Sequence, residues 1–350
     1  MDFEFYFIEQ IKKHPCIMPR DVVKMCYQAA FGAEHLLMDV DAAKRYFDAE
    51  FASVNPRQGE LFECLSDEIC RVDLGAWKAY GMPSEWLFRM FVASATTKQG
   101  SCERFLSYLS RVETCLTECN AAFSFDEWQD YLAEYKRSEM GAVHHSDRYR
   151  ESEAPSYRVI NRKFLRVLPI LQRVAELPCG TEARVIAIDG RAASGKTTLS
   201  SLLRVVLDAE VIHMDDFFLP PELRTKERLA EAGGNVHYER FLSEVVSKVR
   251  NLIPFSYRIF DCGTMDYCGE RQISESSWRV VEGSYSHHNE LGQYADLRVF
   301  CTVSEEEQMQ RIIARDGEKL AEMFRNRWIP MEEKYFETFD IEKRADIIIK

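Results

Sequence analysis

One short segment in the second half of the chain carries the residue types best suited to hold a phosphate group. Residues 190–197 have the sequence GRAASGKT, in which a second glycine precedes a lysine and a threonine. Glycine lets the backbone approach an anion closely, and the N–H groups of the loop then point toward its oxygen atoms. We expect Lys196 to bridge the outer phosphates of a nucleoside triphosphate and Thr197 to ligate Mg²⁺ through its hydroxyl group.

The flanks of this segment are those that a phosphate-binding loop requires. Residues 185–188 are a short apolar run typical of a buried strand, and residues 198–206 have the apolar spacing of a helix. The order of strand, glycine-rich loop and helix makes the motif informative. We therefore predict that ATP binds to the residues of this loop, which are Gly190, Ala193, Ser194, Gly195, Lys196, Thr197 and Thr198.

Two adjacent acidic residues follow the next predicted strand. Residues 211–213 form that strand, and Asp215 and Asp216 come directly after it. Open α/β sheets bind ligands at the carboxyl ends of their strands, so these carboxylates are expected beside the phosphates. A carboxylate at this position can accept the proton of a substrate hydroxyl group. A helix cap or a turn is the structural alternative for the pair.

Taken in order, several segments resemble the uridine kinase-like branch of P-loop kinases, which includes uridine kinases, phosphoribulokinases and bacterial pantothenate kinases. The segments are GRAASGKTT, VIHMDDFF, EAGGNVHYERF, VVEGSY and RIIARDG with WIPMEEKYF, and they cover about residues 184–350. The resemblance implies a three-layer α/β/α fold with a parallel sheet and transfer of the γ-phosphoryl group of Mg-ATP to a hydroxyl group. It also matches Asp215 to the catalytic base of that family, and it implies that Asp216, one place later, contacts the substrate or a magnesium-bound water. The first half of the chain is outside it.

The resemblance implies further site residues on the later strands and helices. Glu282 ends a predicted strand and is expected near Mg²⁺ through a water molecule, with a structural turn acid as the alternative. Arg311 and Arg315 lie four positions apart on a predicted helix, where family members use arginines in a lid over the nucleotide. A guanidinium group can neutralise the charge of the transferring phosphoryl group. We predict a catalytic role for Arg315 and nucleotide contact for Arg311, which could instead pair with the glutamates of residues 305–307.

The acceptor site is expected where the sequence departs from the uridine kinases. Residues 233–241, GGNVHYERF, stand at the place of their substrate-binding stretch, but only an asparagine and a nearby histidine of the pattern Asn-Phe-Asp-His-Pro are present. Residues 257–267 resemble the hairpin that lines the acceptor pocket, and residues 328–336 are expected to pack. Uridine, another nucleoside or another hydroxylated metabolite all stay open as the acceptor. The predicted substrate contacts, with packing as the alternative for the aromatic ones, are Asp216, Asn235, His237, Tyr238, Arg240 and Tyr257.

The first half of the chain has a different pattern. The length of 350 residues suggests two domains at about 150 residues each. Helical spacing dominates residues 1–177, ending in a helix predicted over about 157–176, and Pro178 and Gly180 indicate a linker. We predict a mainly α-helical domain of unknown role over residues 1–177 and a P-loop kinase domain over residues 178–350. The polar residues 141–158, which include His144 and His145, are either a ligand or partner loop or a solvated connector.

Composition limits the classes of partner. The 45 basic and 57 acidic residues give a net charge of −12, which argues against a protein that coats nucleic acid. No apolar run reaches the roughly 18 residues that span a bilayer, and the start of the chain lacks the basic residues of a signal peptide. Eleven scattered cysteines suit a reducing compartment. We expect a cytoplasmic protein with a small-molecule acceptor and no nucleic-acid or membrane partner.

Two questions stay open at the level of sequence. The chain could form a homo-oligomer. It could also be a regulatory ATPase that senses nucleotide, with its helical domain bound to a protein partner. Asp215 and the acceptor-like residues 233–241 favour the kinase over this alternative.

Overall fold

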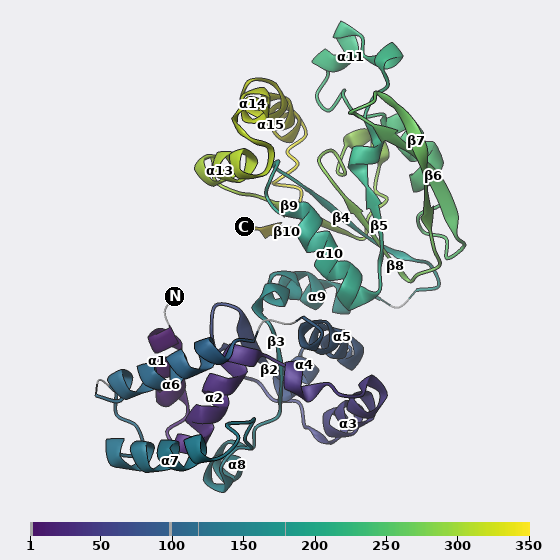
Figure 1. Cartoon of the computed structure of the whole chain (residues 1–350). Helices are drawn as coiled ribbons and strands as arrows, with labels where there is room; N and C mark the ends of the chain where they lie inside the picture. Colours follow the sequence, from purple (N-terminus) through teal and green to yellow (C-terminus); the bar gives the residue numbers. More distant parts are fainter. Residues whose placement is uncertain (1–2, 98–99, 118, 179) are drawn as a thin grey trace. The chain divides into compact units, whose positions relative to one another are not determined.

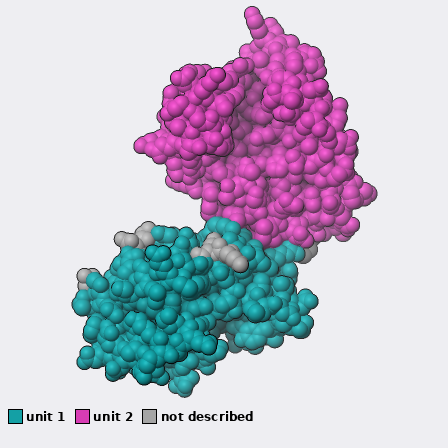
Figure 2. Space-filling view, viewed as in Figure 1, with its two compact units in different colours: residues 1–165 teal, residues 166–350 magenta. Residues whose placement is uncertain are grey.

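The computed structural model describes residues 3–97, 100–117, 119–178 and 180–350. It divides into two compact units, Met1–Leu165 and Arg166–Lys350, which we call unit 1 and unit 2 (Figure 2). Residues 166–177, which the sequence analysis assigned to the helical half, group with unit 2. In the described ranges, no helix is long and apolar enough to cross a membrane.

Unit 1 is mainly helical and contains one small antiparallel sheet of the order β1-β2-β3 (Figure 1). Helix α2 begins at Pro19, whose ring suits the first turn of a helix, and Gly32 with a positive φ follows its last residue. The elements of unit 1 are α1 (Phe3–Lys13), α2 (Pro19–Phe31), η1 (Glu34–Leu36), α3 (Val40–Ser53), β1 (Phe62–Cys64), β2 (Ile69–Asp73), α4 (Leu74–Ala79), α5 (Ser84–Ala95), α6 (Cys102–Leu116), α7 (Phe125–Arg137), α8 (Asp147–Glu153) and β3 (Tyr157–Asn161).

The sheet of unit 1 corrects one prediction of the sequence analysis. The helix expected over residues 157–176 is wrong in its first part, because Tyr157–Asn161 forms strand β3 and pairs with Ile69–Asp73. The last three residues of β3 are buried in this pairing, so tertiary contacts override the local helical spacing. After the short turn η2 (Arg162–Val167), only Leu168–Ala175 is α-helical.

Unit 2 is built on a parallel sheet of five strands in the order β10-β9-β4-β8-β5. Its elements are α9 (Leu168–Ala175), β4 (Arg184–Gly190), α10 (Lys196–Leu207), β5 (Glu210–His213), η3 (Met214–Phe217), η4 (Pro221–Leu223), α11 (Lys226–Ala230), α12 (Tyr238–Phe241), η5 (Leu242–Val246), β6 (Phe255–Asp261), β7 (Asp266–Ile273), β8 (Trp278–Glu282), η6 (Asn289–Leu291), β9 (Leu297–Cys301), α13 (Glu305–Asp316), α14 (Glu318–Met323), η7 (Phe324–Trp328), α15 (Ile329–Thr338) and β10 (Ile347–Ile349). The antiparallel hairpin of β6 and β7 is separate from this sheet.

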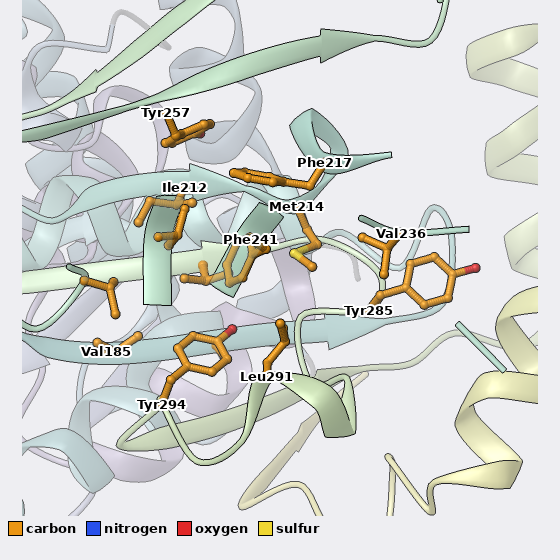
Figure 3. Close-up of a cluster of buried hydrophobic side chains, with 14 of the residues drawn as sticks. Val185, Ile212, Met214, Phe217, Val236, Phe241, Tyr257, Tyr285, Leu291 and Tyr294 are labelled. Atoms are coloured by element: carbon orange, nitrogen blue, oxygen red, sulfur yellow. The ribbon is translucent and has the colours of Figure 1, made fainter. Parts of the chain in front are cut away.

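The core of unit 2 explains why its strands are nearly continuous apolar runs. On one face of the sheet, Val185 and Ile212 belong to a buried cluster that also holds Phe241 from helix α12 (Figure 3). The same cluster includes Tyr335 of α15. Helix α10 contacts β4, β5 and β8. Strands covered by helices must be apolar on both faces, and the predicted α/β fold with a parallel sheet is confirmed. This packing fixes the carboxyl ends of β4, β5 and β8 beside one another.

Candidate active site

The phosphate-binding motif forms a tight loop between β4 and α10. Gly190, Ala193 and Gly195 have φ values of 139°, 57° and 94°, all in the range that disfavours most L-residues. A β-carbon on Gly190 would lie only 2.0 Å from the carbonyl oxygen of Cys301 on β9. Glycine is therefore required at residue 190 because the neighbouring strand approaches it, while Gly195 turns the chain into the first turn of α10.

Lys196 is the first residue of α10, and its amine stays within the loop. Its Nζ donates hydrogen bonds to the carbonyl oxygens of Gly190 at 2.6 Å and Arg191 at 2.9 Å. Helix α10 has twelve residues, so its N-terminal N–H groups and its dipole also favour an anion at this end. A cation, free N–H groups and a positive helix end thus converge on one position.

Asp215 follows β5 on the turn η3 and faces the same recess. Its carboxylate lies above Gly283, since a β-carbon on that glycine would be 3.4 Å from Oδ1 of Asp215. Although the side chain reaches the solvent of the recess, the surrounding protein desolvates it and raises the pKa of Asp215. Lys196 opposes this rise, and the nearby carboxylate of Glu282 adds to it. A carboxylate with a raised pKa is a stronger base once it has lost its proton.

Glu282 ends β8 and lies between Thr197 and His213. Its Oε1 is 2.6 Å from Nδ1 of His213, and its Oε2 is 3.4 Å from the hydroxyl group of Thr197. A hydroxyl and carboxylates are oxygen ligands of the kind Mg²⁺ takes, with phosphates and water completing its octahedron. The part of the chain that the structure describes has no cluster of three histidine, cysteine or acidic side chains for a metal. Thr197 and Glu282 therefore fit a magnesium ion that arrives with phosphate.

These groups open into one cavity of about 770 Å³ in unit 2. Figure 1 shows the hairpin β6–β7 and the helices α13 and α15, which supply residues of its lining, and the space-filling view of Figure 2 shows a hollow in unit 2. Of the residues that the sequence predicted, those lining the cavity are Ala193, Gly195, Lys196, Thr197, Thr198, Asp215, Asn235, Glu282, Arg311 and Arg315. Arg311 donates to the carbonyl of Ala193 at 3.0 Å and to Glu307, while Arg315 bonds its neighbour Asp316.

Seven predicted residues, Gly190 included, lie outside the lining of this cavity. Asp216 is buried, and its Oδ2 accepts hydrogen bonds from the Tyr257 hydroxyl at 2.9 Å and from Nε of Arg271 at 3.1 Å. Arg240 is buried over the ring of Phe217. Through these contacts, the side chains of Asp216 and Arg240 hold turn η3 to the hairpin of β6 and β7. The predicted residues away from the lining are Ser194, Asp216, His237, Tyr238, Arg240 and Tyr257, and Gly190 contributes through its backbone position.

Several lining residues were missed by sequence reasoning. Residues 328–336 were expected to pack, yet Trp328, Met331 and Glu332 line the cavity, and only Tyr335 and Phe336 enter the core. Glu332 is buried and accepts hydrogen bonds from the backbone N–H of Ala192 at 3.0 Å and from the Ser284 hydroxyl at 2.7 Å. Burial raises the pKa of Glu332, and Lys196 opposes this.

A signal for this wall was present in the sequence. Phe324 and Trp328 are four positions apart, on one helix face, and their rings pack edge to face at 4.6 Å. They begin and end a π-helical turn, η7, and such turns are frequent at functional sites. Arg224, Cys262 and Met265 complete the opposite wall, and no pattern in the sequence marked Arg224.

Comparison with known proteins gives a likeness in structure only. No model of a protein family matches the sequence, and no curated protein matches it. One similar solved structure is described as a possible uridine kinase from Bacillus stearothermophilus, with 21% identity over 53% of this chain and 97% of that chain and a TM-score of 0.41. Another, described as a candidate fructose transport system kinase from a Silicibacter species, has 19% identity over 54% and 98% of the two chains and a TM-score of 0.43.

Proposed function

We propose that unit 2 is a phosphotransferase that moves the γ-phosphoryl group of ATP to a hydroxyl group of a small molecule. The observation that carries this is the convergence of Lys196, Thr197, Asp215 and Glu282 on one cavity at the carboxyl ends of parallel strands. The acceptor is a nucleoside, such as uridine, or another hydroxylated metabolite. With Mg²⁺ bound, the nucleotide would supply the transferable group and a metal that neutralises its charge.

The residues of the chain divide the work as their positions allow. The loop amides and Lys196 hold the phosphates, and Thr197 and Glu282 hold the metal. Asp215 accepts the proton of the acceptor hydroxyl and orients its oxygen toward the phosphorus atom. Arg315 and Arg311, on the helix that lines the cavity, stabilise the charge on the transferring group. Trp328 and Phe324 form an apolar wall that keeps water from competing with the acceptor.

The test is a phosphorylation screen of hydroxylated metabolites with Mg-ATP, in which each product is detected by its mass. We expect one metabolite to raise ATP consumption and to gain a phosphoryl group. Asp215→Asn should then lower kcat by about 10³-fold while ATP affinity stays within about twofold. Asp340→Asn, at an exposed position, is the matched control and should behave like the parent.

Two outcomes would contradict this proposal. Parent-level turnover in Asp215→Asn would remove Asp215 as the base. ATP hydrolysis that is indifferent to every metabolite, with a protein that co-purifies, would instead favour the regulatory ATPase.

A further inference from the structure

A second cavity of about 370 Å³ lies within unit 1, at the lower end of the range for small-molecule pockets. Both signs of charge line it, and two of the ion pairs, Lys13 with Glu60 and Arg57 with Asp73, are at its rim. The remaining charged groups are Arg71 on β2, its cross-strand neighbour Glu63 on β1, and His14 and Glu153. Its lining residues are Lys13, His14, Arg57, Gly59, Glu60, Phe62, Glu63, Arg71, Asp73, Tyr149, Glu153, Pro155, Ser156 and Tyr157.

Arg71 is a buried cation with a fixed orientation and unused donors. It is 4% exposed, and its Nε and Nη2 donate to Oε1 of Gln28 at 2.9 and 2.7 Å. Nη1 makes a longer bond to Oε1 of Gln10 at 3.4 Å, and the guanidinium lies 4.6 Å from the centre of the Tyr157 ring. Three of its five N–H groups thus have an acceptor in the described part of the chain, where no carboxylate pairs with it directly. The planar group is prepared for a carboxylate.

The tyrosine beneath Arg71 is itself held by a chain of hydrogen bonds. The Tyr157 hydroxyl lies 2.6 Å from Nε2 of His145, and Nδ1 of His145 lies 2.9 Å from Asp21. Burial, together with Arg71 and Lys24, lowers the pKa of His145 to about 4, so this imidazole is neutral at pH 7 and accepts the tyrosine proton in a hydrogen bond. Burial and Arg71 also lower the pKa of Lys24 to about 8. Burial alone would lower the pKa of Arg71, but the neighbouring tyrosines, Glu63 and Asp21 leave it raised, so the guanidinium stays charged despite its burial.

Two carboxylates of the cavity lie next to Arg71 or close to His14. The ring of His14 lies between two carboxylates, with Nε2 3.1 Å from Glu63 and Nδ1 3.2 Å from Glu153. Burial lowers the pKa of His14, but the two carboxylates outweigh it and leave the pKa raised. Burial raises the pKa of Glu63, but His14 and Arg71 bring it down to about 2. Two carboxylates around one imidazole give this group of side chains a net negative charge whether or not the ring is protonated.

Gln10 contacts both Arg71 and Glu63, and its amide indicates the polarity of a ligand that could contact both. Its buried amide accepts from Arg71 with its oxygen and donates to Glu63 at 3.3 Å with its nitrogen. An α-amino acid carries an anionic acceptor and a cationic donor in the same order. We propose that this cavity binds a small zwitterion of the α-amino acid class, with its carboxylate on Arg71 and its ammonium group facing Glu63 and Glu153.

The test is calorimetric titration of the full chain with the common L-amino acids, one at a time. We expect at least one to bind with one site per chain. The corresponding amine without the carboxylate, and the corresponding acid without the amino group, should each bind at least about tenfold more weakly. Inorganic phosphate is a separate arm. Lack of binding by every amino acid at about 10 mM, or equal affinity for phosphate or for the amine-free acid, would overturn the proposal.

Two variants test the separate roles of Arg71 and of the carboxylates. Arg71→Lys keeps the charge but loses the planar fork, and should weaken amino acid binding at least about tenfold. Glu153→Gln, at a partly exposed side chain, should weaken binding of the amino acid and leave binding of the amine-free acid unchanged. Glu68→Gln, from an exposed ion pair with Arg104, is the matched control. If Arg71→Lys fails to fold by circular dichroism, the Glu153→Gln result still decides, and equal affinities for the amino acid in Glu153→Gln and the parent would overturn the assignment.

Discussion

The two cavities of this protein are assembled from the chain in different ways. In unit 2, the loop proposed to bind phosphate is one continuous segment. Asp215 and Glu282 lie at the carboxyl ends of the adjacent strands β5 and β8. In unit 1, the groups come from distant helices and strands, and His14 meets Glu153 across 139 positions of sequence. A site held by backbone geometry leaves a local signature in the sequence. A site held by side chains on packed elements leaves none until the elements are placed.

The largest expected effect tests the site held by the loop. Lys196→Met should lower kcat of phosphotransfer by about 10³-fold, because it removes the cation to which the proposed mechanism assigns the phosphates. Amino acid binding in unit 1 should keep the affinity of the parent. Steady-state kinetics and calorimetry measure the two, and Lys319→Met, exposed on α14, is the control. A change in amino acid affinity in Lys196→Met would show that the two sites are not independent.

The next effect concerns the proton balance of unit 1. The pKa of His145 is about 4 in the folded chain against an ordinary 6.5, so the unfolded chain binds the proton first as the pH falls. The stability that His145 contributes is therefore present above pH 6.5 and is lost as the pH falls toward 4, by up to about 3 kcal/mol. His14 has a raised pKa, so its contribution is already complete below pH 6.5 and does not offset this loss.

Urea unfolding between pH 4 and 7, followed through hydrogen exchange of unit 1 amides, measures this loss. His145→Gln should reduce the dependence of the unfolding free energy on pH by up to about one proton. His144→Gln, at the exposed neighbouring position, should leave it unchanged. The same pH dependence in both variants would contradict the assignment. In unit 2, the raised pKa of Asp215 works the other way, since its contribution is present at low pH and is lost as the pH rises.

A third prediction concerns backbone approach in unit 2. Gly283 has a φ of 133°, and a β-carbon there would lie 2.7 Å from Cβ of Met214. Gly283→Ala should lower the free energy of unfolding by about 2 kcal/mol. It should also displace Asp215, which follows Met214 on turn η3. Gly269→Ala is the control, since Gly269 has a φ of 147° with open space around it. The urea midpoints of the two variants measure the loss of stability. An equal loss in both would mean that backbone strain alone, without the close approach to Met214, accounts for the effect of Gly283→Ala.

The smallest effect separates two arginines of the helical wall. Arg315→Ala should lower kcat by about tenfold, because its guanidinium lines the cavity but is largely exposed and bonded to Asp316. Arg325→Ala removes an exposed arginine that is outside the lining and should leave kcat unchanged. Equal kcat values for the two variants would show that Arg315 does not contribute to catalysis.

The sequence predicts the parts of unit 2 that depend on local chemistry. The phosphate loop, the strand before it and the helix after it follow from glycine positions and apolar spacing, and the structure has them as β4 and α10. The sequence placed both Asp215 and Asp216 at the site and could not show that only Asp215 faces the cavity. One carboxylate faces the cavity and the other is bonded to Tyr257 and Arg271, because their side chains leave turn η3 in different directions.

The rest depended on contacts that no local pattern contains. Residues 157–161 have helical spacing but become β3, because β2 offers a partner strand. His145 lies in a polar segment that suggested a ligand loop or a connector. Its role depends on hydrogen bonds to Asp21, which is distant in sequence, and to Tyr157 on β3. Arg71 looks like any strand arginine until its burial is known.

The two bonds that Lys196 makes to the carbonyls of Gly190 and Arg191 have a consequence for selectivity. The amine is already well satisfied by neutral acceptors, so a neutral ligand would gain little by replacing them. Only a ligand with full negative charge offers an appreciably stronger acceptor. The cavity should therefore discriminate first by charge and only then by shape, which would exclude uncharged metabolites from the nucleotide end and leave them the end nearest Asp215.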